Sequence, residues 1–95
     1  MTPQTIKIVS LVGIVAENKD IARTIRIDLI TPALQQGDDV VLDFSEVTLM
    51  TQSFCHALIS EVIRSFGIDI LERISFAHCT PEVRGIVEIV VDYMQ

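Results

Sequence analysis

Residues 40–66 read VVLDFSEVTLMTQSFCHALISEVIRSF, and this stretch decides the fold. It begins with an apolar run at residues 40–44 that only Asp43 interrupts. Continuous runs of this kind are typical of strands that are covered on both faces. We therefore predict that residues 40–44 form the central strand of a sheet.

The second half of the same stretch predicts a helix over residues 53–66. Apolar side chains recur there at helical spacing, and Gly67 follows as a stop signal. Ser53 is the expected N-cap of this helix. A residue at this position holds its hydroxyl at the positive end of the helix, where an anion such as a phosphate is stabilised.

Two further stretches are predicted to be strands, and the first of them alternates apolar and polar residues and is rich in β-branched ones. They are residues 5–9, which read TIKIV, and residues 74–78, which read ISFAH. After the second of them, Thr80 is the expected N-cap of a last helix that continues to Met94, with Pro81 as its first residue.

A first helix is predicted over residues 17–36, where apolar residues again recur at helical spacing. Asn18 or Glu17 can open it. Pro32 lies inside the pattern, and proline removes a backbone hydrogen bond and clashes with the preceding turn. The helix should therefore kink or restart near Thr31.

The order of these elements predicts an α/β fold in a single domain that covers residues 1–95. Right-handed crossovers would join the strands into a small, mainly parallel or mixed sheet of three to four strands, with helices packed on it. Ligands of such sheets gather beyond the carboxyl ends of the strands. The loops after Phe44 and after His78 should share that edge.

Composition excludes several classes of function. Thirteen acidic and seven basic residues give a net charge of −6, which disfavours binding to nucleic acid or to an anionic membrane. No signal peptide or membrane-spanning run is evident, so we expect a cytoplasmic protein with reduced cysteines. No phosphate-binding glycine loop, catalytic pair of carboxylates or Ser-His-Asp arrangement can be assembled, so we expect neither a cofactor nor enzymatic activity.

Two Cys-His pairs leave an alternative open. Cys55 and His56 begin the second helix, while His78 and Cys79 lie at the end of the last strand. All four are ligand types that suit zinc. Neighbours on a helix point about 100° apart and neighbours on a strand point oppositely, which disfavours convergence. The helix dipole would activate the Cys55 thiol, although its apolar stripe favours core packing. A small metal- or thiol-dependent protein is therefore the alternative.

Residues 42–58, LDFSEVTLMTQSFCHAL, resemble the STAS domain of bacterial anti-sigma factor antagonists, in which a strand ending in LDL or a similar sequence leads through a short loop into a serine-capped helix. The TQSF at residues 51–54, with the preceding LDF, is more similar still to small stand-alone STAS-like proteins of undefined function. This likeness extends over residues 6–91.

In the antagonists, a partner kinase phosphorylates the serine that opens this helix, so the resemblance implies Ser53 as the phosphoacceptor. The chain differs from the antagonist pattern at three positions. Thr51 stands in place of an aspartate, Gln52 in place of a first serine, and Phe54 in place of a glycine.

The resemblance implies a non-enzymatic regulatory module that binds a kinase-like ATPase or an anti-sigma factor. The expected partner-binding side chains belong to the loop after the central strand and to the start of the next helix: Ser45, Glu46, Thr48, Met50, Thr51, Gln52, Ser53 and His56. Asp43 is expected to brace this loop by accepting hydrogen bonds. A further alternative is a homodimer formed through the last helix or an unpaired edge strand.

Overall fold

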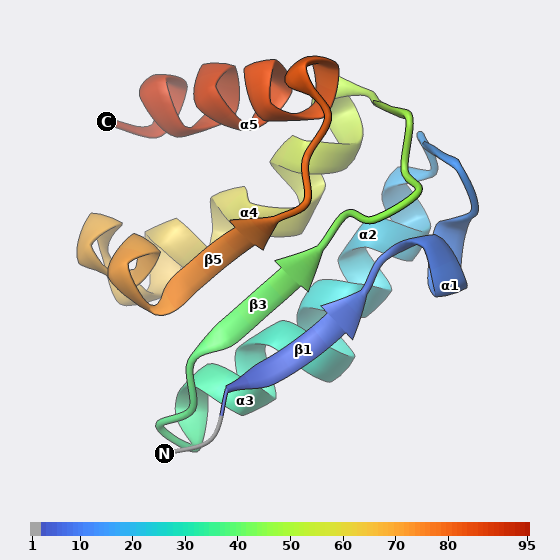
Figure 1. Ribbon diagram of the computed structural model, residues 1–95. Helices are drawn as coiled ribbons and strands as arrows, with labels where there is room; N and C mark the ends of the chain where they lie inside the picture. The colour runs from blue at the N-terminus through green and yellow to red at the C-terminus, as the bar shows by residue number, and fades with distance from the viewer. Residues whose placement is uncertain (1–2) are drawn as a thin grey trace.

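The computed structural model describes residues 3–95 and has an α/β architecture built on a three-stranded parallel sheet. Its strands are β1 (Gln4–Lys7), β3 (Val40–Asp43) and β5 (Ile74–Ala77). The strand order is β1-β3-β5, with Ile6 opposite Leu42 and Leu42 opposite Phe76 (Figure 1). Strand β3 is therefore central, as the sequence predicts.

Five α-helices accompany the sheet within the described residues. They are α1 (Val9–Val12), α2 (Lys19–Ile25), α3 (Thr31–Gln35), α4 (Gln52–Phe66) and α5 (Pro81–Met94). A π-helical turn, η1 (Arg26–Ile30), joins α2 to α3, and a 3-10 helix, η2 (Ile68–Arg73), follows α4.

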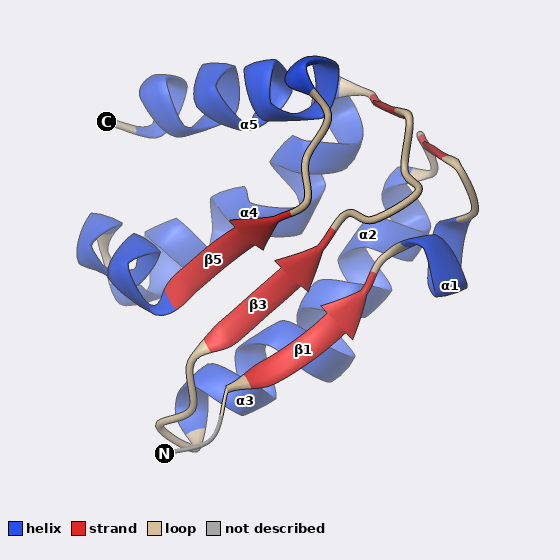
Figure 2. Cartoon of the chain, in the orientation of Figure 1, coloured by secondary structure: helices blue, strands red, loops and turns tan. Residues whose placement is uncertain are grey.

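The helices α2, α3 and α4 lie on the same face of the sheet, behind the strands in Figure 2. The strands follow one another across the sheet in one direction. Two right-handed crossovers, one from β1 to β3 and one from β3 to β5, therefore place their helices on the same side. Val40 and Leu42 are consequently buried, whereas Val41 and Asp43 point to the other face and are only half-buried. The prediction that this strand is covered on both faces was wrong.

The helix predicted over residues 17–36 is interrupted near the predicted place. Asn18 caps it, and its side-chain oxygen accepts hydrogen bonds from two backbone N–H groups of the first turn, at 2.9 and 3.2 Å. The helix widens into the π turn and resumes as α3 at Thr31. Because Pro32 lacks an N–H and its ring crowds the preceding turn, the wider turn accommodates it.

Two short strands are absent from the sequence prediction. Strands β2 (Val15–Ala16) and β4 (Leu49–Met50) pair in parallel and form a second, two-stranded sheet beyond the carboxyl ends of the main strands (Figure 2). Strand β1 ends at Lys7 rather than at residue 9, because the chain turns directly into α1.

Thr51, not Ser53, caps α4. The Thr51 hydroxyl oxygen accepts a hydrogen bond of 3.1 Å from the backbone N–H of Phe54. Ser53 lies within the first turn, and its side chain is exposed. The prediction of Ser53 as the cap was wrong, because β4 ends at Met50, the helix begins at Gln52, and Thr51 is the last extended residue between them.

The start of α5 agrees with the sequence. The Thr80 hydroxyl oxygen accepts a hydrogen bond of 3.1 Å from the backbone N–H of Val83, and Pro81 is the first helical residue. The helix continues to Met94, as predicted.

One hydrophobic cluster joins the sheet to the helices. Phe44 and Phe54 are its largest fully buried side chains, and Phe44 stacks on Phe76 with ring centroids 6.4 Å apart. Cys55 is part of this cluster. None of the helices within residues 3–95 combines the length and the apolar character that crossing a membrane requires.

Candidate functional site

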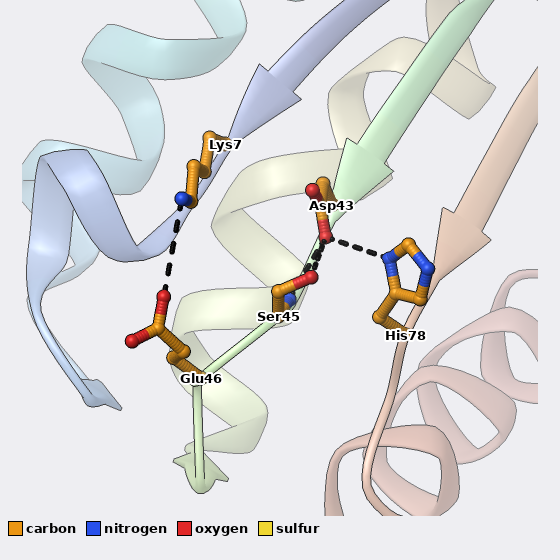
Figure 3. Close-up of polar contacts among 5 residues, drawn as sticks. All are labelled: Lys7, Asp43, Ser45, Glu46 and His78. Carbon is orange, nitrogen blue, oxygen red and sulfur yellow. Dashed lines mark hydrogen bonds and ion pairs between the residues drawn. The ribbon is translucent and has the colours of Figure 1, made fainter.

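The carboxyl edge of the main sheet brings together residues from two separate loops. Asp43 Oδ1, at the end of β3, accepts hydrogen bonds from the backbone N–H of Ser45 at 2.9 Å and from its hydroxyl at 2.5 Å. His78, directly after β5, places its Nδ1 3.0 Å from the same oxygen (Figure 3). The loops after Phe44 and after Ala77 therefore meet at this edge.

The charge on Asp43 fixes the state of this cluster. Hydrogen bonds from the Ser45 hydroxyl, the Ser45 backbone and the His78 ring hold the pKa of Asp43 at about 2. An ionised carboxylate can only accept hydrogen bonds, so His78 Nδ1 must carry the donated hydrogen. The rest of the His78 side chain, which is 69% exposed, is then presented to solvent in a fixed orientation.

The backbone around this cluster adopts an uncommon conformation at two positions. Glu46 has a φ of 69° and His78 has a φ of 59°, both in the left-handed region. Side chains other than glycine occupy this region at a cost in free energy. Lys7 Nζ lies 3.9 Å from Glu46 Oε2, but both side chains are more than half exposed, so this ion pair contributes little to stability.

The rest of the predicted partner-binding loop is mostly anchored by its own contacts. Thr48 Oγ1 donates a hydrogen bond of 3.1 Å to the carbonyl of Ile14, and Thr51 caps α4. Met50 is only 6% exposed and belongs to the core. Its prediction as a partner-binding side chain is therefore wrong, because the pairing of β4 with β2 turns it inward.

The first turns of α4 border an open groove of about 590 Å³. Gln52, Ser53 and His56 line it from α4, and Arg26 lines it from η1. The Arg26 guanidinium donates a hydrogen bond of 3.3 Å to the carbonyl of Ala57, which holds it against α4. The groove thus combines a guanidinium with the positive end of a helix, and Glu61 of α4 adds one carboxylate to its lining.

His56 separates this groove from a smaller one that Tyr93 of α5 lines. Its ring packs edge-on against Tyr93, with ring centroids 5.9 Å apart. The Nδ1 atom of His56 is buried and has no hydrogen-bond partner among the described residues. His56 is half-buried, so it contributes less to the exposed surface than Gln52 and Ser53.

The structure does not support the alternative based on cysteine and histidine. Burial raises the pKa of the Cys55 thiol to about 12, and burial also raises the pKa of Cys79, so the surroundings of both thiols oppose formation of the nucleophilic thiolate. His78 contacts Asp43 rather than a cysteine. Within residues 3–95, no three His, Cys, Asp or Glu side chains are grouped so that they could hold a metal ion.

Two features of the site, the contact of His78 with Asp43 and the position of Arg26, were not predicted from the sequence. The pairing of His78 with Asp43 could have been inferred from the two predicted strand ends, since both residues lie at the shared edge. Arg26 gives no comparable signal, because a basic residue within a helical pattern usually lies on a solvated face.

Comparison with known families gives one match. Residues 22–84 match the family model of the STAS-like domain of unknown function (DUF4325). No curated protein and no solved structure matches the chain. The matched segment runs from α2 to the start of α5 and contains Asp43, Ser53 and His78. Because the match covers most of the sequence, the chain belongs to the family of STAS-like domains of unknown function.

Proposed function

We propose that this STAS-like domain is a non-enzymatic regulatory module that binds another protein through the start of α4 and the loop before it. The observation that carries the proposal is the exposure of Gln52 and Ser53 at the first turn of a fifteen-residue helix. The hydrogen bonds to Asp43 and to Ile14 hold the preceding loop, so little conformational entropy is lost when a partner binds.

The partner that the resemblance implies is a kinase-like ATPase or an anti-sigma factor, and phosphorylation of Ser53 would control its binding. Ser53 lines the same groove as Arg26. A phosphate here would add nearly two negative charges beside a helix N-terminus and a guanidinium, both of which stabilise it. It would change the charge of the binding surface without refolding the domain.

The test is a pull-down from the native host with the wild type, Ser53→Asp and Ser53→Ala. We expect the wild type and Ser53→Ala to recover an ATPase or anti-sigma factor, and Ser53→Asp to lose it. Mass spectrometry of the protein purified from the host should also detect a phosphopeptide that contains Ser53.

Ser65→Asp is the matched control, because Ser65 is exposed in the last turn of the same helix. It adds the same charge far from the groove and should leave the recovered partner unchanged. Equal recovery by Ser53→Asp and the wild type would rule out a switch at Ser53. Recovery of neither an ATPase nor an anti-sigma factor by the wild type would contradict the partner class.

A further inference from the structure

Strand β1 forms one edge of the main sheet, and its outer side is unpaired within the described residues. In its parallel pairing with β3, the backbone groups of Gln4, Ile6 and Ile8 point inward, as the hydrogen bonds from Gln4 to Asp39 and from Ile8 to Asp43 show. The N–H and C=O groups of the alternate residues point outward. No described backbone group pairs with Thr5 or Lys7 on that side.

A groove of about 280 Å³ runs beside this edge. Besides β1 itself, it is lined by Ser10 and Leu11 of α1 and by Leu29 of η1. Leu11 is 44% exposed and Leu29 is 41% exposed, so two leucines flank a row of unpaired backbone groups. Exposed edges with apolar borders are sites at which another strand adds to a sheet.

We propose that the strand that adds here is β1 of a second copy of this chain, antiparallel and related by a two-fold axis at Ile6. In this register, Thr5 of one copy lies opposite Lys7 of the other. Each such pair exchanges both of its hydrogen bonds, which satisfies every outward-facing group of both residues. The two sheets then become one continuous sheet, and this interface goes beyond the surface of the proposed function.

Charge favours this edge for self-association. A chain with a net charge of −6 repels its own copies over most of its surface. The residues that line the β1 groove include no carboxylate, and Lys7 is their single charged side chain. The register at Ile6 also keeps the two Lys7 residues from lying opposite each other, because each faces a threonine.

The first test is sedimentation equilibrium of the full chain over a range of concentrations. Thr5→Pro removes an outward N–H that β1 does not use for pairing with β3, whereas Thr5→Val keeps it. We expect the wild type and Thr5→Val to dimerise and Thr5→Pro to dimerise at least about tenfold more weakly. A monomeric wild type, or an equally strong Thr5→Pro dimer, would overturn the proposal.

A second pair of variants tests the apolar border. Leu29→Asp places two carboxylates beside the two-fold axis and should weaken the dimer, whereas Ile27→Asp should not. Ile27 is 52% exposed and lies on the same π turn, but it does not line the groove. Equal effects of the two changes would contradict this interface.

Amide hydrogen exchange of the wild type gives a readout that needs no variant. At dimer concentrations the amides of Thr5 and Lys7 should be protected, and on dilution they should exchange quickly. A dimer in which these amides remain unprotected uses another surface and overturns the proposal. This measurement decides the question even if Thr5→Pro fails to fold, and it is independent of any partner at α4.

Discussion

A single carboxylate oxygen, that of Asp43, organises the carboxyl edge of the sheet. It accepts hydrogen bonds from Ser45 and His78, which lie in different loops. Removing one acceptor would therefore release two segments of the chain and expose unpaired donors. The loop conformation thus depends on the ionisation state of one residue.

The ionised carboxylate of Asp43 should stabilise the fold at neutral pH and lose this effect in acid. The pKa of Asp43 is about 2 in the folded chain, whereas an unfolded aspartate has a pKa of about 3.9. The stabilisation by its charge is present above pH ~4 and is lost as the pH falls through about 2. In urea unfolding, Asp43→Asn should be less stable than the wild type at pH 7, and this difference should shrink between pH ~4 and ~2.

Asp92→Asn is the control, because Asp92 is exposed and its side chain makes no described hydrogen bond or ion pair. It should leave the unfolding free energy close to that of the wild type at every pH. A difference between the wild type and Asp43→Asn that does not change with pH would exclude the ionised carboxylate as its cause.

The second prediction separates two neighbouring hydroxyls. Thr51→Ala removes the cap of α4 and should lower the unfolding free energy by about 1 kcal/mol. Ser53→Ala removes an exposed side chain and should change it by less than about 0.5 kcal/mol. Urea unfolding at pH 7 measures both, and a larger loss for Ser53→Ala would reverse the assignment of the cap.

The sequence could not distinguish these hydroxyls, because either one precedes a plausible helical stripe. The choice depends on where β4 ends, and β4 exists only through its pairing with β2. The role of Asp43 was easier to predict, since an aspartate that interrupts an apolar strand needs nearby donors. Its contact with His78 depends on a parallel register that joins residues far apart in the chain.

At the scale of elements, two glycines differ in whether their backbone conformation favours glycine. Gly67 ends α4 with a φ of 90°, whereas Gly85 lies inside α5, and a Cβ added at either position meets no other atom. Gly67→Ala should therefore lower the unfolding free energy by about 1–2 kcal/mol, because only the backbone is strained. Gly85→Ala should raise it by about 0.5–1 kcal/mol, because alanine favours the helix.

Thermal unfolding followed by circular dichroism compares these variants directly. Each glycine serves as the control for the other, since both changes add one methyl group in open space. Melting temperatures that shift in the same direction would show that backbone conformation does not determine the outcome.

Elements with a clear period could be predicted, and elements without one could not. The long apolar stripes of α4 and α5 identified both helices, and Pro32 identified the interruption before α3. Strands β2 and β4 have two residues each, too few to show alternation. The apolar run of β3 could not reveal its open face, because coverage depends on the direction of the crossovers.

At the scale of the whole molecule, one hydrophobic cluster connects the sheet with the helices. A chain with one shared core should unfold cooperatively. The reactivity of the Cys55 thiol measures whether unfolding is cooperative, because this thiol is buried and its pKa is raised to about 12 in the folded chain. In a Cys79→Ser background, labelling of Cys55 and loss of circular dichroism should have the same urea midpoint.

The unfolded chain in high urea is the control, and its Cys55 should react at the rate of an ordinary thiol. Labelling of Cys55 well below the midpoint would show that α4 opens before the rest of the fold.

The left-handed backbone at Glu46 and His78 bears on how this domain would respond to artificial evolution. Glycine adopts this conformation without strain, so a library screened only for heat resistance should accumulate glycine at both positions. The variants selected in this way would lose the imidazole that is hydrogen-bonded to Asp43 and the carboxylate beside Lys7. A screen for heat resistance and a screen for partner binding would thus select different residues at these two positions.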